Sequence, residues 1–151
     1  MAVFEIVKIG DPVLKEVAKP VPKISANILK LLHNMADTMY AAEGVGLAAP
    51  QIGISKRVIV IDAGQGLIEL INPEILEQAG EQTDTEGCLS IPGMAGEVTR
   101  ANKVVVKYLN RAGQQQTIEG EALLARALQH EIDHLEGILF VDKATNVVRN
   151  K

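Results

Sequence analysis

The residues with the clearest potential for chemistry lie close together near the end of the chain. His130 and His134 are four positions apart in QHEIDHLEG, and Glu131 directly follows the first of them. Residues four apart on a helix lie one turn apart on the same face, so both imidazoles can point at a single cation. The neighbouring carboxylate could then act as a base toward a water molecule. The spacing therefore predicts an HExxH metal site.

Residues 121–137, EALLARALQHEIDHLEG, predict the helix that would carry these groups. Most of them are good helix formers, and Gly137 can end the helix in a left-handed cap. At about 100° per residue, both histidines share a narrow stripe with Leu123 and Ala127. The opposite side carries Arg126, Gln129, Asp133 and Glu136. A buried polar group without a partner costs about 1–3 kcal/mol, so the histidines need either a metal or backbone carbonyls in the core. On this stretch alone both interpretations stay open.

A catalytic site would need a third protein ligand. The extended pattern HExxHxxGxxH fails downstream because position 140 is Phe140, and Asp142 is the only acidic residue after the helix. Upstream, His33 falls on the rim of an expected helix. Cys88 lies in EGCLSIPG, where glycine and proline allow the backbone to come close to a metal. Cys88 is therefore the favoured third ligand, with a small buried apolar residue as the alternative.

The composition bounds the class of protein. The chain has 151 residues, of which 47% are hydrophobic and 23% charged, and this predicts one globular domain over residues 1–151. A net charge of −4 without a basic run argues against nucleic acid as the main ligand. A single cysteine cannot form an internal disulfide, and no apolar run reaches membrane-spanning length. We therefore expect a soluble protein of the cytoplasm that does not engage a membrane.

The apolar pattern predicts an α+β fold. Residues 1–22 favour an extended arm with a short helical turn, and the stretch between Ile24 and Ala42 favours an N-terminal helix. Strands are expected at 57–62, 67–73, 98–109 and 114–121, with EGCLS as a loop. Antiparallel β-sheets should pack around the central metal-binding HExxH helix.

The segment GVGLAAPQIG, residues 44–53, has two interpretations. With Asp62 downstream it fits a GxGxxA dinucleotide pattern, but it follows a helix and runs into Pro50, so the context argues against a nucleotide site. Gly44 and Gly46 better fit a loop along a cleft, where exposed backbone pairs with an extended peptide. Gln51 could donate to an oxyanion there, although on chemistry alone a solvent-facing side chain is the better interpretation.

Three segments together, GVGLAAPQIG, EGCLS and QHEIDHLEG, resemble the signature motifs of the peptide deformylase family in the same order. DPVLKEVAKPV and RVIVID…LINPEI are also similar to that family, so the resemblance covers nearly the whole chain. It implies a metal-dependent hydrolase that removes the N-formyl group from the N-terminal methionine of nascent polypeptides and releases formate.

The resemblance also implies roles for single residues. Cys88, His130 and His134 would hold one divalent metal ion. Glu131 would be the general acid and base, and Gln51 with the backbone N–H of Leu89 would form the oxyanion hole. Ferrous iron is the usual metal of the family, and Zn²⁺, Ni²⁺ or Co²⁺ can take its place.

The resemblance also implies where the substrate binds. Val45, Leu123 and Ala127 match family positions around the methionine side chain, and the peptide backbone would extend along Gly46 on one side and Gly87 on the other. N-formylmethionyl nascent peptides are the implied partners, and the ribosome near its exit tunnel stays open as a further one.

Two rival classes remain at this point. A metallopeptidase that cuts internal peptide bonds is disfavoured by the missing downstream ligand. A metal-storage or structural metal protein would leave Glu131, a charge on the apolar stripe, without a purpose.

Overall fold

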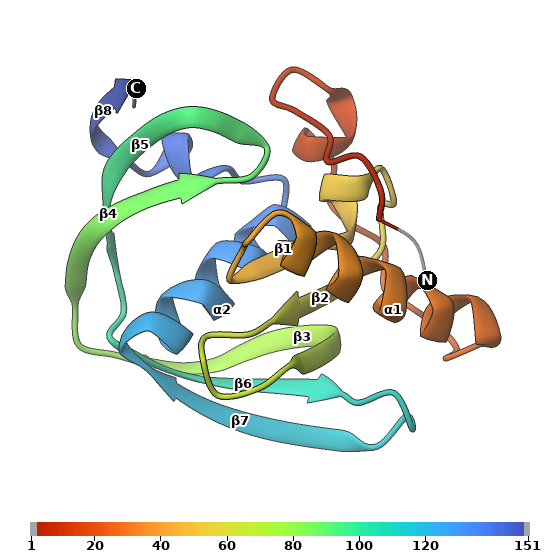
Figure 1. Ribbon diagram of the computed structural model, residues 1–151. Coiled ribbons are helices and arrows are strands. Elements are labelled where there is room, and N and C mark those ends of the chain that lie inside the picture. The colour runs from red at the N-terminus through yellow and green to blue at the C-terminus, as the bar shows by residue number, and fades with distance from the viewer. Residues whose placement is uncertain (1–2, 150–151) are drawn as a thin grey trace.

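The structure, a computed structural model, describes residues 3–149. Two helices, α1 (Ala26–Ala41) and α2 (Ala122–Leu135), lie among eight strands in the described part of the chain (Figure 1). The strands are β1 (Gly46–Ala48), β2 (Val58–Ile61), β3 (Ile68–Ala79), β4 (Gln82–Cys88), β5 (Ile91–Arg100), β6 (Lys103–Leu109), β7 (Gln115–Glu121) and β8 (Thr145–Arg149). Short 3-10 turns occupy Pro12–Lys15, Ala49–Ile52 and Phe140–Asp142.

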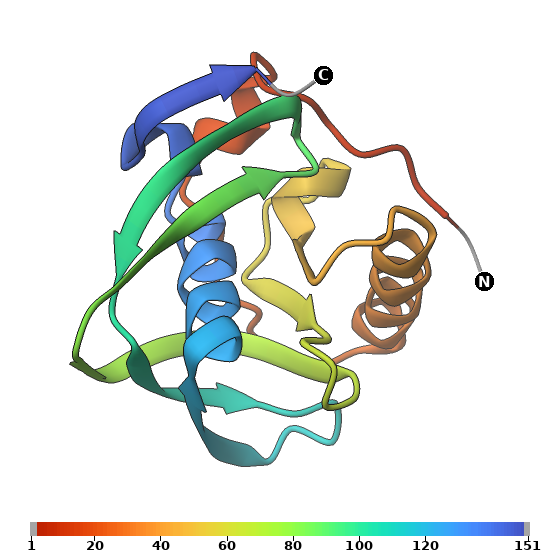
Figure 2. The same cartoon turned by 60° about the vertical axis from the view of Figure 1, so that its left-hand side comes forward.

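The strands form two antiparallel sheets. One has five strands in the order β1-β2-β3-β6-β7, and the other has three in the order β4-β5-β8. Helix α2 runs between the two sheets, while α1 lies to the side of β1 and β2 (Figure 2). The predicted α+β class with antiparallel sheets is confirmed. No helix among residues 3–149 is long and apolar enough to cross a membrane.

Three apolar clusters hold these layers together. The first packs α2 on the five-stranded sheet through Leu124, Leu128, Ile132, Leu135, Ile59, Ile61, Leu70, Val104 and Val106. The second packs α1 against β1 and β2. The third lies under the three-stranded sheet and joins Ile91 and Val98 to Leu14, Leu139 and Phe140, which come from the N-terminal turn and from the segment after α2.

Helix α2 lies within the predicted range. It begins after Glu121, whose backbone is extended, and it ends at Leu135. Gly137 follows with a φ of +75°, and a Cβ on it would lie only 2.5 Å from the carbonyl oxygen of Lys15. The glycine therefore ends the helix and also allows the N-terminal turn to approach.

Two strand predictions were wrong. The expected strand 98–109 is broken: β5 ends at Arg100 and β6 begins at Lys103, and the two belong to different sheets. EGCLS is only partly a loop, because Glu86, Gly87 and Cys88 form the end of β4 and only Leu89 and Ser90 form a turn. The polar sequence of β4 conceals the strand because it is an edge strand whose residues are mostly exposed.

Candidate metal centre and active site

The three predicted metal ligands meet between β4 and α2. Cys88 is the last residue of β4, and His130 and His134 lie one turn apart on α2. One donor atom from each residue lies within 4.8 Å of the other two. Cys88 Sγ and His134 Nε2 are 3.3 Å apart, close to the separation of about 3.5 Å expected between ligands of a tetrahedral ion. This group could hold one cation.

The partners of the two imidazoles do not match the core-histidine alternative. His130 Nδ1 lies 2.9 Å from Glu86 Oε1, and His134 Nε2 faces the Cys88 sulfur. These partners are side chains rather than backbone carbonyls. His134 Nδ1 is buried with no hydrogen-bond partner in the described structure. Phe140, which stands where the extended HExxH pattern has a third histidine, instead stacks on the His130 ring at 6.5 Å.

Electrostatics differ between the two rings. Burial and the neighbouring His130 hold the pKa of His134 well below its ordinary value, which favours the neutral imidazole that binds metals. Burial also opposes protonation of His130, but Cys88, Glu131 and Glu86 together raise its pKa to about 10. A metal at His130 therefore competes with a proton.

Glu131 is buried beside this group. The residue is 4% exposed, and Oε1 has no hydrogen-bond partner in the described part of the chain. Burial raises its pKa to about 7, against the opposing effect of His130. A Cβ at Gly46 would lie 2.7 Å from Glu131 Oε2, so Gly46 makes room for this carboxylate. Gly44 does the same for Leu89, whose Cδ1 lies 2.8 Å from the position of a Cβ there.

Gln51 does not face solvent, so the interpretation that chemistry alone favoured was wrong. The side chain is 1% exposed, and its Oε1 accepts a hydrogen bond from the backbone N–H of Ala48 at 3.0 Å. This bond turns Nε2 toward Ser90 Oγ at 3.1 Å and Cys88 Sγ at 3.5 Å. The amide is thus a fixed donor beside the ligand group. Leu89 follows Cys88 directly in the chain and lines the same cavity.

A cavity of about 440 Å³ opens in front of these groups. It brings together all five residues predicted to bind substrate, and its lining includes Val45, Gly46, Gly87, Leu123 and Ala127. Leu123 and Val45 lie at the rim with 52% and 38% of their surface exposed, whereas Ala127 lies deeper at 7%. Gln51, Cys88, Leu89, His130 and Glu131 also line the cavity.

Sequence reasoning missed the residues behind His130. Glu86 accepts hydrogen bonds from Arg100 in addition to its contact with His130 Nδ1, and it forms an ion pair with Arg126. Burial alone would raise the pKa of Glu86, but the bonds from His130 and Arg100 lower it to about 2. A local signal existed, since Glu86 precedes Cys88 by two positions and Arg126 precedes His130 by one helical turn.

Comparison with known proteins identifies the family. The family model described as "Polypeptide deformylase" matches residues 3–150. The chain belongs to the polypeptide deformylase family. The peptide deformylase of Carboxydothermus hydrogenoformans is 69% identical over 99% of this chain and 98% of that protein. The one from Pelotomaculum thermopropionicum is 64% identical over 97% of this chain and 95% of that protein.

Solved structures of the family are similar along the whole fold. The crystal structure of peptide deformylase from Thermotoga maritima has a TM-score of 0.93 and 46% identity, and covers 95% of this chain and 98% of that one. The Synechococcus elongatus enzyme in complex with actinonin has a TM-score of 0.92 and 45% identity, and covers 95% of this chain and 79% of that one.

The family and activity predicted from three motifs are confirmed. Metal-dependent hydrolysis of the formyl group on the N-terminal methionine of new polypeptides is the function of the deformylase family. The rival classes, a metallopeptidase and a protein that only stores metal, are therefore set aside.

Proposed function

We propose that residues 1–151 form a single catalytic domain in which Cys88, His130 and His134 hold the metal that deformylation requires. The observation that carries this proposal is the convergence of one sulfur and two imidazole nitrogens within 4.8 Å, with Cys88 and His130 lining the cavity. Three protein ligands leave one position open, as in catalytic rather than structural sites. We infer ferrous iron as the metal in the cell, with Zn²⁺, Ni²⁺ or Co²⁺ able to replace it.

A divalent cation bound there would polarise the formyl carbonyl and lower the pKa of its bound water toward about 7. The proton transfers fall to Glu131. Its unpartnered Oε1 is free to accept the proton of the water molecule that attacks the formyl carbon. The same carboxyl then returns that proton to the amine of the departing methionine, and formate is the second product.

The oxyanion of the tetrahedral intermediate needs donors that are fixed in advance. Gln51 Nε2 meets this need because the Ala48 N–H holds the other end of the amide. The backbone N–H of Leu89 would be the second donor. Removing one such donor typically costs about 10²–10³ in turnover, and loss of the Gln51 amide should fall in this range.

The substrate would lie extended between the two sheets. Strands β1 and β4 are edge strands of their sheets, and both border the cavity, at Gly46 and Gly87. Their free backbone groups can pair with a peptide in an extended conformation. The methionine side chain would then enter the apolar part formed by Val45, Leu123 and Ala127. We place this activity in the cytoplasm, on chains that emerge near the ribosomal exit tunnel.

The test is formate release from formyl-Met-Ala-Ser by protein that is purified without oxygen and analysed for bound metal. We expect rapid release with about one metal ion per chain, and no reaction with the acetylated peptide. If protein carrying one metal ion per chain releases no formate, this assignment of function is wrong. If Cys88→Ala, His130→Ala and His134→Ala all keep the metal, the assigned ligands are wrong.

A further inference from the structure

The side of α2 that faces the three-stranded sheet is polar. Arg126, His130 and Asp133 follow one another at intervals of four and three residues, which places them on one face of the helix. The apolar cluster around α2 contains no residue of β4, β5 or β8 among those described, and the cluster under the three-stranded sheet contains none of α2. Long polar side chains therefore make the connection between this helix and this sheet.

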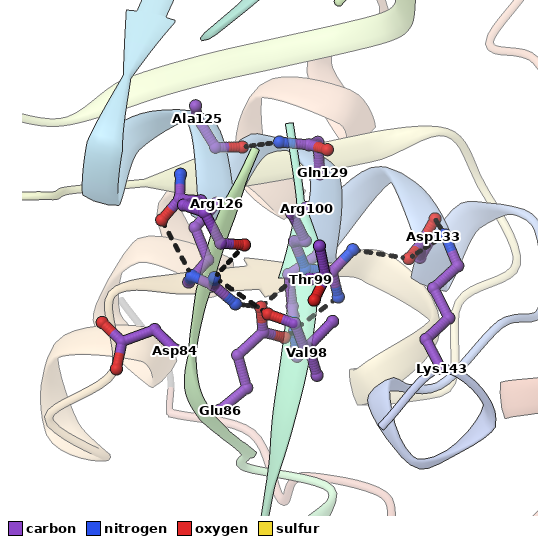
Figure 3. A network of polar contacts seen from close by, with 12 residues as sticks. Asp84, Glu86, Val98, Thr99, Arg100, Ala125, Arg126, Gln129, Asp133 and Lys143 are labelled. Atoms are coloured by element: carbon purple, nitrogen blue, oxygen red, sulfur yellow. Dashed lines mark hydrogen bonds and ion pairs between the residues drawn. The ribbon is translucent and has the colours of Figure 1, made fainter. Parts of the chain in front are cut away.

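Glu86 is the centre of this connection (Figure 3). Its side chain is 5% exposed. Oε1 lies 2.9 Å from His130 Nδ1 and accepts a bond of 2.9 Å from Arg100 Nη2. Oε2 accepts a bond of 2.6 Å from Arg100 Nε and pairs with Arg126 Nη1. Two guanidinium groups thus fix the carboxylate that contacts a predicted metal ligand.

The two arginines differ in where they come from. Arg100 lies at the end of β5, the strand that pairs with β4, so it fixes Glu86 within its own sheet. Arg126 lies on α2, the helix that also carries His130, and it pairs with Glu86 from there. It reaches both β4 and β5, since Nη2 donates to the carbonyl oxygens of Val98 at 3.0 Å and Gln82 at 3.3 Å.

Arg126 lines the cavity, but each of its three guanidinium nitrogens already has a protein partner among the described residues. Nε donates to Gln82 Oε1 at 3.2 Å, Nη1 is paired with Glu86, and Nη2 is bonded to the two carbonyls. The residue is 6% exposed. Its contacts therefore fit the fixing of other side chains rather than the recognition of a peptide carboxylate.

We propose that Arg126 is a positioning residue of the metal centre: it holds the Glu86 carboxylate against His130 Nδ1 and so presents His130 Nε2 to the metal. This inference rests on the proposed function, in which His130 is a ligand. Carboxylates that contact a ligating histidine fix its tautomer and ring orientation, and their loss typically weakens metal binding 10–100-fold. Because Glu86 and Cys88 share β4, Arg126 also fixes the strand that carries the sulfur relative to the helix that carries the nitrogens.

The test compares Arg126→Met and Arg126→Lys with Arg111→Met. Arg111 is also paired with a glutamate, through two bonds to Glu69 at 2.8 and 2.6 Å, but this pair is exposed and far from the cavity lining. Each protein is loaded with Co²⁺, and its visible absorption spectrum and its rate of metal loss to a chelator are recorded. Thermal unfolding of the metal-free forms measures the purely structural effect of each substitution.

We expect Arg126→Met to lose Co²⁺ about 10–100-fold faster than the unchanged protein, with a shifted spectrum. Arg126→Lys keeps the positive charge but loses the planar guanidinium group. Its rate of Co²⁺ loss should lie between those of Arg126→Met and the unchanged protein, and Arg111→Met should match the unchanged protein. If Arg126→Met is less stable but keeps the normal rate and spectrum, Arg126 has only a structural role. If Arg126→Met does not fold, Arg126→Lys decides by the same two readouts.

One further variant separates this inference from the proposed function. His130→Ala should lose Co²⁺ faster than any Arg126 variant. If His130→Ala retains Co²⁺ as the unchanged protein does, His130 is not a ligand and the proposed site itself is wrong. If His130→Ala loses the metal and Arg126→Met does not, only the positioning role is overturned.

Discussion

The two long sides of α2 make different kinds of contact. Toward the five-stranded sheet the helix presents Leu124, Leu128 and Leu135, which pack on β-branched and leucine side chains without any directional bond. Toward the three-stranded sheet it presents Arg126, His130 and Asp133, and each of these forms a hydrogen bond or ion pair with a side chain of that sheet. The first side fixes the helix in the fold, and the second fixes its orientation relative to β4.

The difference teaches why both kinds of contact are present. Burying one leucine contributes about 1.5–3 kcal/mol, but an apolar contact tolerates small shifts. Buried ion pairs add little net stability, because desolvation offsets most of the attraction. Their value here lies in geometry, since a hydrogen bond weakens when its distance or angle changes. A metal site assembled from a helix and a strand needs that constraint.

The largest effect is expected at Glu131, a charged residue that lies in line with Leu124 and Leu128 on the apolar side of α2. In the proposed function, its buried, unpartnered oxygen transfers a proton rather than positions another residue. We expect Glu131→Gln to lower turnover by about 10²–10⁴-fold, the contribution of a general acid and base. Metal content should stay near one ion per chain, measured by elemental analysis beside the kinetics. Near-normal turnover would contradict the assignment.

Leu128→Ala should weaken only the apolar packing between α2 and the five-stranded sheet. Leu128 is fully buried in the cluster between α2 and the five-stranded sheet. Removing its side chain should lower the free energy of unfolding by about 2–5 kcal/mol. The rate of Co²⁺ loss at 25 °C should stay within about threefold of normal, because the directional bonds to β4 remain. Denaturant unfolding and chelator kinetics measure the two quantities, and a tenfold faster metal loss would show that the two sides are not independent.

The sequence was a good guide to the apolar side. Helix α2 has a strong helical period and a glycine at its end, and β2 is the uninterrupted apolar run VIVI, buried throughout. Such patterns are local, so they predict an element without knowledge of its neighbours. The convergence of His130 and His134 could also be predicted, because residues four apart share one face of any helix.

The polar side could not be predicted in the same way. Arg126, Gln129 and Asp133 lie opposite the apolar stripe, where charges usually face water, yet Arg126 is 6% and Gln129 7% exposed. The partners of Arg126 are on β4 and β5, strands that their polar residues, Pro92 and Gly93 made hard to predict, and Gln129 bonds to Ala101 just after β5. A contact between residues 40 positions apart leaves no period in the sequence, so Glu86–Arg126 emerges only when the strands are placed.

The outer end of the polar network should give the smallest effect. Lys143 forms an ion pair of 3.1 Å with Asp133, and 44% of the lysine side chain is exposed, whereas Arg100 binds the same carboxylate with a side chain that is only 2% exposed. Exposed pairs contribute about 0–1 kcal/mol. Lys143→Met should therefore lower the unfolding free energy by less than about 1 kcal/mol and leave the Co²⁺ spectrum unchanged. A shifted spectrum would mean that even an exposed residue of the network affects the geometry of the proposed metal site. Burial would then not determine which residues of the network hold the ligands in place.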